Sequence, residues 1–151
     1  MDSLDTRLLR EVQRDCTRSA AQLAEICGTT ESTALRRLRR MRRDGTILAE
    51  VALVDPSRVG RGLTIFVKVR LEQETGDGAK RFVDRIRVCP DVVQFFFVTG
   101  TSDYIIMLCV GQMEDYDRFV QTNLVADPCD VMSDTNVVIR PIKWSREIQI
   151  D

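Results

Sequence analysis

Residues 30–47, TESTALRRLRRMRRDGTI, have the pattern of one amphipathic helix that ends at a glycine. The apolar residues recur at helical spacing, which places them on one side: Ala34, Leu35, Leu38 and Met41. The opposite side is polar and basic: Ser32, Thr33, Arg36, Arg39, Arg40 and Arg43. Six arginines fall between positions 36 and 43. We therefore expect a helix with an apolar inner stripe and an arginine-covered outer surface.

An arginine-covered helix surface has two interpretations. The planar guanidinium group donates two parallel hydrogen bonds, which suits phosphate groups and the guanine edge. A helix of this kind also fits the DNA major groove. The alternative is a charged face that is simply solvated. Because these arginines lack the interleaved glutamates of a salt-bridged surface helix, the pattern favours nucleic-acid binding.

The residues before this helix predict two shorter helices at close spacing. The first has an apolar stripe of Leu4, Leu8, Leu9 and Val12, with Asp2 as its expected cap. The second opens with a capping box of Ser19 and Gln22 and ends at Gly28. Thr29 or Thr30 then caps the arginine helix. Such a short turn between two helices is typical of a helix-turn-helix motif, whose second helix reads the groove.

The composition is that of an ordinary globular chain of 151 residues, with 44% hydrophobic and 30% charged residues. The absence of histidine excludes Ser–His and Cys–His nucleophile pairs. The five cysteines lack the spacing of a zinc or redox site. The sequence therefore predicts no enzyme, no metal and no cofactor.

The net charge of −1 does not oppose DNA binding, because binding depends on the local field. Residues 30–47 alone carry six arginines against Glu31 and Asp44, a net charge of +4. No stretch approaches the roughly 18 uncharged apolar residues of a membrane helix. The N-terminus also lacks the apolar core of a signal peptide. We expect a cytoplasmic, nucleoid-associated protein without membrane contact.

The rest of the chain alternates strand and helix patterns. Strand patterns occupy residues 63–72, 92–99, 104–110 and 131–139, and helical patterns occupy residues 77–88 and 113–124. This βαββαβ order is the ferredoxin-like arrangement. Turn residues between positions 55 and 62 indicate a boundary. We predict an α+β protein with a helix-turn-helix (winged-helix-like) domain at residues 1–54, a hinge at 55–62, and a ferredoxin-like domain at 63–151.

Three consecutive aromatic residues, Phe95, Phe96 and Phe97, lie within one predicted strand. Because successive strand residues point to opposite faces, large aromatics are expected on both sides of the sheet. The helices cover one face of the sheet. Aromatic side chains on the other face need another surface to pack against. We expect a second copy of the sheet, hence a homodimer, which would present two recognition helices to two DNA half-sites.

In their order and spacing, these elements resemble the Lrp/AsnC family, the leucine-responsive or feast/famine transcription regulators. The likeness spans nearly the whole chain. It rests on Leu4-Asp-x-x-Leu-Leu-x-x-Val12, on Leu23-Ala24 through Arg36-Arg37-Leu38 to Asp44-Gly45-x-Ile47, on Val98-Thr99-Gly100-x-x-Asp103-Tyr104, and on Thr135 and Lys143.

The resemblance implies a DNA-binding regulator with a C-terminal domain for ligand sensing and oligomerisation. It further implies dimers, often assembled into octamers, and an amino acid or related small metabolite as effector. In the family, the effector pocket lies between neighbouring dimers. It is lined by the loop at residues 100–103 and by facing residues of the last strand.

The predicted DNA-binding residues all lie on the arginine helix. Ser32, Thr33 and Arg36 come early on its outer face and are the candidates for reading bases. Arg39, Arg40 and Arg43 come later and are expected to hold backbone phosphates. Arg37 completes the candidate set.

The predicted effector-binding residues are Thr99, Gly100, Thr101, Ser102, Asp103, Tyr104, Ser133 and Thr135. Gly100 permits close approach of the backbone, so that loop N–H groups can meet a carboxylate. Asp103 can accept from an ammonium group, and Ser133 and Thr135 point the same way on the last strand. The alternative is a plain β-turn in which Asp103 is the capping residue.

Two classes of function remain open. The first is a sequence-specific transcription regulator whose DNA binding or assembly is modulated by an amino acid or related metabolite. The second is a ligand-independent, nucleoid-type DNA-organising protein whose C-terminal domain only oligomerises. A third class, an enzyme on the ferredoxin-like domain, is disfavoured because the chain has no P-loop and no metal-ligand spacing.

Overall fold

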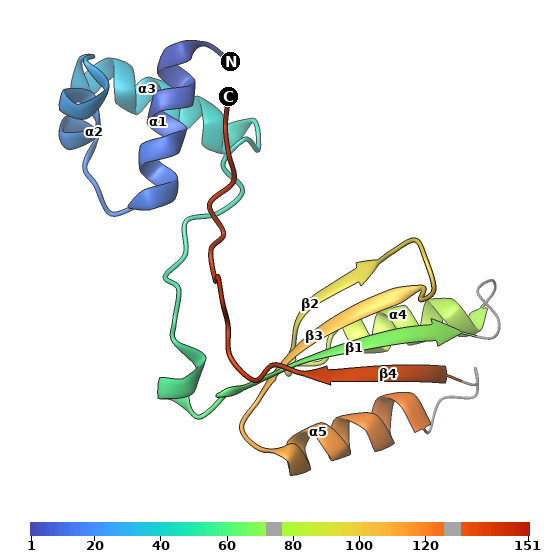
Figure 1. Ribbon diagram of the computed structural model, residues 1–151. Helices are drawn as coiled ribbons and strands as arrows, with labels where there is room; N and C mark the ends of the chain where they lie inside the picture. The colour runs from blue at the N-terminus through green and yellow to red at the C-terminus, as the bar shows by residue number, and fades with distance from the viewer. Residues whose placement is uncertain (72–76, 126–130) are drawn as a thin grey trace. The chain divides into compact units, whose positions relative to one another are not determined.

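The computed structural model describes residues 1–71, 77–125 and 131–151 (Figure 1). The chain divides into two compact units. One unit comprises Met1–Leu53 together with Ile142–Asp151, and the other comprises Val54–Pro141. The first is helical and the second combines one sheet with helices, so the predicted α+β class is confirmed.

Three helices form the first unit: α1 (Ser3–Arg14), α2 (Ala20–Cys27) and α3 (Glu31–Arg43). Each begins at a side-chain cap, as the sequence predicts. Asp2 caps α1, Ser19 forms a capping box with Gln22 at α2, and Thr30 caps α3. Gly28 ends α2 in the left-handed region at φ 62°, which allows the short turn into α3.

The apolar stripes of the three helices meet in one core. It contains Leu8, Leu9, Val12, Leu23, Ala24, Cys27, Ala34, Leu38 and Met41. Ala34, Leu38 and Met41 of α3 are almost fully buried. The expectation that Leu35 lies in this inner stripe is wrong: Leu35 is only half-buried and lies among the arginines. It stands one residue after Ala34, and about 100° of rotation carries it to the edge of the core.

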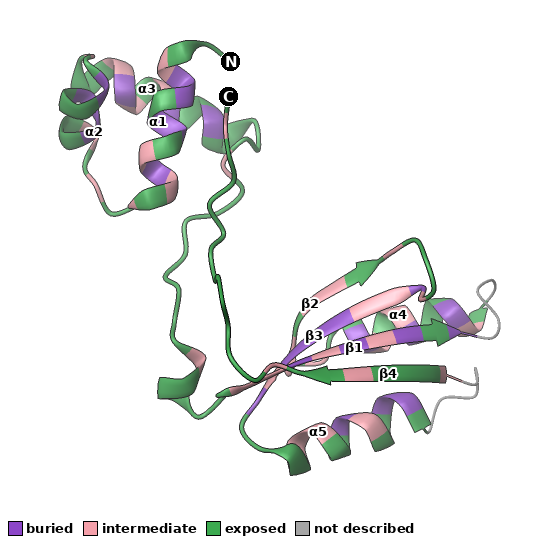
Figure 2. Ribbon diagram, viewed as in Figure 1, coloured by how far each residue is buried: buried purple, intermediate pink, exposed green. Residues whose placement is uncertain are grey.

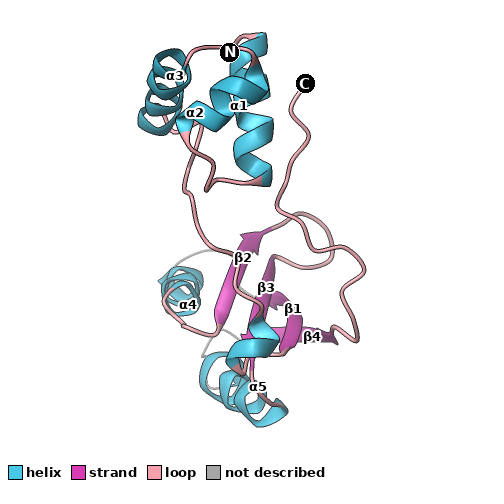
Figure 3. Cartoon of the chain, turned by 90° about the vertical axis from the view of Figure 1, so that its left-hand side faces the viewer, coloured by secondary structure: helices cyan, strands magenta, loops and turns pink. Residues whose placement is uncertain are grey.

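The second unit is a four-stranded antiparallel sheet in the order β2-β3-β1-β4. Its strands are β1 (Leu63–Leu71), β2 (Val92–Phe97), β3 (Tyr104–Val110) and β4 (Val131–Val137). A 3-10 turn, η1 (Pro56–Val59), precedes β1. The helices α4 (Asp77–Arg87) and α5 (Met113–Val120) both cover one face (Figure 3), and a π-helical turn, η2 (Gln121–Val125), follows α5. This confirms the ferredoxin-like arrangement.

Alternating residues of β1 form the centre of this unit's core. Ile65, Val67, Val69 and Leu71 are buried and pack with residues of α4 and α5 (Figure 2). The three phenylalanines of β2 alternate across the sheet as expected. By register, Phe95 pairs with buried Ile106, whereas Phe96 pairs with Ile105 and is 50% exposed on the face that the helices leave open.

The end of the described chain, residues 147–151, contacts α1. Arg10 donates to the Ile150 carbonyl oxygen at 2.6 and 3.0 Å. Gln13 exchanges two hydrogen bonds with the Ile148 backbone at 3.0 and 3.1 Å. Ile150 packs against the helical core. The sequence predicts one domain at residues 63–151, whereas residues 142–151 belong to the helical unit. The physical reason is that Ile150 packs against the core of α1, α2 and α3.

The contact of Ile150 predicts a local stability effect. Ile150→Ala should destabilise α1 by about 1–2 kcal/mol, less than a fully buried site, because Ile150 is only half-buried. Amide hydrogen exchange of α1 in the full chain should then be faster by roughly 5–30-fold. The matched control is Ile148→Ala, since Ile148 is 69% exposed in the same tail. Equal exchange in the two variants would contradict the assignment.

Candidate nucleic-acid interface and effector domain

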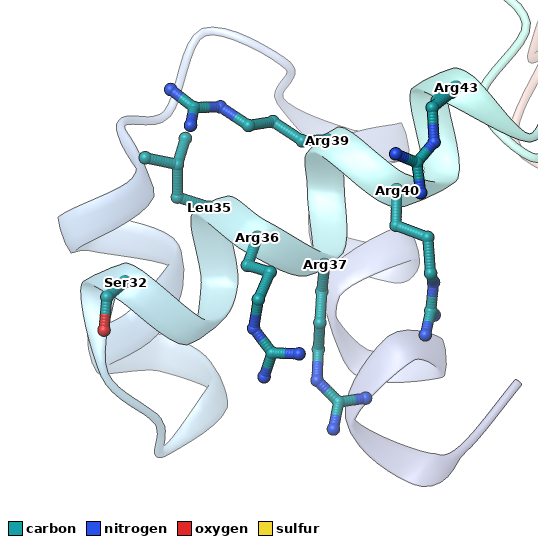
Figure 4. A pocket seen from close by; sticks show the side chains of 7 residues that line it. All are labelled: Ser32, Leu35, Arg36, Arg37, Arg39, Arg40 and Arg43. Atoms are coloured by element: carbon teal, nitrogen blue, oxygen red, sulfur yellow. The ribbon is translucent and has the colours of Figure 1, made fainter.

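The outer surface of α3 forms an open groove of about 760 Å³ (Figure 4). It is lined by Ser32, Leu35, Arg36, Arg37, Arg39, Arg40 and Arg43. Six of the seven predicted DNA-binding residues therefore gather on one surface. The seventh, Thr33, is half-buried, and its hydroxyl group accepts a hydrogen bond from the Thr30 hydroxyl at 2.9 Å. Thr33 thus belongs to the start of the helix more than to the groove.

Two of the arginines are bound by acidic residues at the start of α1: its N-cap Asp2 and Asp5 in its first turn. Asp5 Oδ1 accepts from Arg37 Nη1 at 3.0 Å, and Asp5 Oδ2 accepts from Arg40 Nη2 at 2.6 Å. Arg37 also donates to Asp2. The Asp5 side chain is only 2% exposed, and that of Arg37 is 20% exposed. These contacts fasten α3 to the first turn of α1.

The arginines also set the charge state of the two carboxyl groups. For Asp5, burial acts to raise the pKa, but hydrogen bonds from Arg40 and Arg37 outweigh it and lower the pKa. For Asp2, the hydrogen bond from Arg37 is the largest cause and lowers the pKa to about 2. Both carboxylates are therefore anionic at neutral pH, and Arg37 in turn has a raised pKa because of Asp2 and Asp5.

The remaining arginines of α3 differ in their partners. Arg42 pairs with Glu50 at 2.7 Å. Within residues 1–71, 77–125 and 131–151, the side chains of Arg36, Arg39 and Arg43 have no ion pair. All three are exposed. They are the guanidinium groups of this helix that are available to an external anion.

The loop between β2 and β3 carries most of the predicted effector residues. Gly100 adopts φ 121°, a conformation that favours glycine. The Val98 N–H donates to the Asp103 carbonyl oxygen at 2.8 Å and closes the loop. Asp103 is buried, and its Oδ2 accepts from the Leu71 N–H at 2.7 Å. One oxygen of this carboxylate therefore holds the end of β1, as the turn interpretation expects.

The other predicted effector residues take different environments. Thr99 and Thr101 are exposed, and Ser102 is half-buried. The Tyr104 ring lies in an aromatic cluster with Phe82, Phe95 and Phe97 at 5.3–5.7 Å between ring centroids. Tyr104 therefore packs mainly as a core aromatic.

Ser133 and Thr135 share one face of β4, as the sequence predicts. By register, Val69 pairs with both Tyr104 and Ser133, so the loop and Ser133 flank the same end of β1. Thr135 lies opposite Val67, and its hydroxyl group is 2.5 Å from the Tyr116 hydroxyl group of α5. A hydroxyl partner on α5 was not predicted, because the sequence gives no sign of which helix residue faces β4.

Sequence reasoning also missed the role of Asp5, although a signal was present. Asp5, Leu8, Leu9 and Val12 follow the spacing i, i+3, i+4, i+7, so Asp5 lies on the apolar stripe of α1. A carboxylate on a buried stripe needs a cationic partner. The sequence therefore signals that Asp5 needs a cation, but not which arginine provides it.

Known proteins share both units. Residues 1–42 match the AsnC-type helix-turn-helix domain, and residues 64–148 match the Lrp/AsnC ligand binding domain. The chain is 33% identical to the DNA-binding transcriptional activator DecR of Escherichia coli (strain K12), over 100% of this chain and 99% of that protein.

Solved structures share the whole fold. An AsnC family transcriptional regulator from Agrobacterium tumefaciens superposes with a TM-score of 0.92 at 31% identity, over 99% of this chain and 97% of that one. A transcriptional regulator from Neisseria meningitidis, solved as a complex with L-Met, has a TM-score of 0.92 at 24% identity, over 99% of this chain and 96% of that one.

The helix-turn-helix unit and the sheet unit together define a two-domain DNA-binding transcription regulator. The chain belongs to the Lrp/AsnC family, which confirms the resemblance seen in the sequence. Among the described residues, no three His, Cys, Asp or Glu side chains are placed to hold a metal ion. In the same residues, no helix has the length and apolar character to span a membrane.

The lowered pKa of Asp2 predicts a pH effect. The contribution of this group to stability is present above about pH 4 and is lost as the pH falls through about 2. Asp2→Asn keeps an N-cap side chain but removes the charge. The variant should therefore be less stable than the wild type at pH 5, and the difference should shrink as the pH falls to about 2 and below, as measured by urea denaturation. A stability difference that does not change with pH would contradict the ion-pair assignment.

Proposed function

We propose that α3 enters the DNA major groove and that Ser32, Arg36, Arg39 and Arg43 make its contacts. Arg36 lies early on the helix and reads a base edge, for which bidentate arginine–guanine pairing is the common chemistry. Arg39 and Arg43 hold phosphates. The observation that carries this proposal is that these three arginines, exposed on one surface, have no ion pair within the described ranges.

The assignment changes the roles of three predicted contacts. Arg37 and Arg40 bind the carboxylates of α1, so we assign them to holding α3 in place. Thr33 is assigned to the helix cap in the same way. The free set Arg36, Arg39 and Arg43 follows a spacing of three and four residues, which is one face of a helix.

A second copy of the chain is the proposed cover for the open sheet face. Phe96 is 50% exposed on that face, and its pairing partner on β3 is Ile105. Lys68 and Asp134, paired on the same face at 3.4 Å, give it a polar edge. A homodimer would place two copies of α3 on one duplex, and such dimers could assemble further, up to an octamer.

The proposed effector is an amino acid or a related small metabolite, held by the sheet unit. The match to a ligand binding domain supports this, as does the L-Met complex of the Neisseria relative, which has the same fold. In this chain the loop at residues 99–102 and Ser133 flank one end of β1. Exposed hydroxyl groups and loop N–H groups there suit the carboxylate of a zwitterion.

A second candidate is the ligand-independent DNA-organising role. The observation that favours it is the bond from the Leu71 N–H to Asp103, which occupies one oxygen of the carboxylate expected to meet an ammonium group. In both candidates we propose that the chain acts on DNA in the cytoplasm, associated with the nucleoid. In both it acts by binding alone and has neither a catalytic step nor a cofactor.

Replacement of Arg36 tests the DNA-binding assignment. Arg36→Ala should cost about 1–3 kcal/mol of affinity for a selected duplex and relax the preference at one base position. Fluorescence anisotropy at a fixed salt concentration, with a set of single-base variants of the duplex, measures both effects. Arg42→Ala is the control, because Arg42 is held by Glu50. An unchanged preference in Arg36→Ala would rule out base reading by this residue.

Titration of the purified protein with the twenty amino acids tests the effector. We expect heat from at least one of them by isothermal calorimetry, and a DNase footprint that changes when that amino acid is added. Ser133→Ala should weaken the binding of that amino acid and leave DNA affinity in its absence unchanged. No heat with any amino acid would favour the DNA-organising role.

A further inference from the structure

The best-buried acidic side chain described in the helical unit faces the DNA-reading helix. Asp5 is 1% exposed and lies on the core side of α1. Its oxygens accept from Arg37, from Arg40 and, at 3.2 Å, from the backbone N–H of Asp2. A buried carboxylate with three donors is held in place, and it holds its donors in place in turn.

This carboxylate competes with DNA for the same guanidinium groups. Arginine binds carboxylate and phosphate oxygens by the same fork geometry. The Arg40 side chain is 46% exposed and belongs to the groove, so it lies within the surface that a duplex would approach. Arg37 is less exposed, and its Nε is buried with no hydrogen-bond partner in the described part of the chain. Both cations are thus already neutralised before DNA arrives.

A protein neutralising more phosphates binds all sequences more tightly and with steeper salt dependence. Phosphate contacts carry no direct sequence information, whereas base contacts do. A recognition helix with six free arginines would therefore gain affinity for random DNA. The acidic partners of Arg37 and Arg40 limit this increase in affinity for random DNA. They leave base reading unaffected.

We propose that Asp5 is a specificity-determining positioning residue, which withholds Arg37 and Arg40 from the DNA backbone. This inference rests on the proposed role of α3 in DNA binding. Asp5 itself touches no DNA. Asp2, whose side chain is 56% exposed, assists at Arg37.

The test is a salt titration of Asp5→Asn and wild-type protein on two duplexes. One duplex has random sequence, and the other is obtained by in vitro selection with the wild type. Each added phosphate contact steepens the plot of log affinity against log salt by about 0.9. Asp5→Asn removes the carboxylate from Arg40 and one of the two carboxylates from Arg37, so the slope on random DNA should steepen by about one to two. The preference for the selected duplex should fall accordingly.

A matched control separates this effect from a simple change in net charge. Glu25→Gln also removes one negative charge from the helical unit, but within the described residues Glu25 has no arginine partner. Its slope should equal that of the wild type. Adding Arg40→Gln to Asp5→Asn should return the slope toward the wild-type value, whereas Arg40→Gln alone should leave the slope unchanged.

Several outcomes would overturn the inference. An Asp5→Asn slope equal to that of the wild type would show that Asp5 is only structural. Arg40→Gln alone flattening the slope would show that Arg40 already binds phosphate. If circular dichroism shows that Asp5→Asn does not fold, Asp2→Asn, which frees Arg37 from Asp2, and Arg40→Gln alone decide the question. A wild type that binds neither duplex at low salt would instead refute the proposed function.

Discussion

The burial of one side of α3 is the constraint on which the rest of the DNA-binding unit depends. The helix has 13 residues, a length at which isolated helices are marginal in water. Its arginines at spacings of three and four residues also repel one another. Ala34, Leu38 and Met41 offset both effects by packing against α1 and α2. The outward display of arginine is a consequence of that packing, because the apolar stripe fixes how the helix is rotated.

The two units are joined by two segments of the chain instead of one. The first precedes β1, and the second follows β4 and returns to α1. β1 and β4 are hydrogen-bonded neighbours, with Ile65 opposite Val137. Both connections to the DNA-binding unit therefore leave from adjacent strands of the same sheet. The loop at residues 99–102 lies at the far end of β1 from these exits, since Tyr104 pairs with Val69 and Val110 with Leu63.

The features that could be predicted from the sequence are those set by near neighbours in the chain. Caps at Asp2, Ser19 and Thr30 depend on residues two or three positions away, and strand alternation depends on the next residue. Apart from the placement of Leu35 at the edge of the core, the features that were missed join distant segments. Asp5 and Arg40 are 35 positions apart, and Gln13 and Ile148 are 135 apart. No periodicity encodes which distant partner a buried carboxylate or a chain terminus meets.

On the proposed assignment, the number of arginines along α3 overestimates how many of them are free to bind a polyanion. The sequence offers six arginines on α3, but Arg37, Arg40 and Arg42 each have an acidic partner. The unpaired groups form a stripe on one face instead of a fully charged surface. A narrow stripe orients the helix better, because rotation about the helix axis then changes how many phosphates lie within reach. A helix charged on all exposed sides would bind a duplex equally well in several rotations about its axis. Its base-reading residues would then not face the same bases in each rotation.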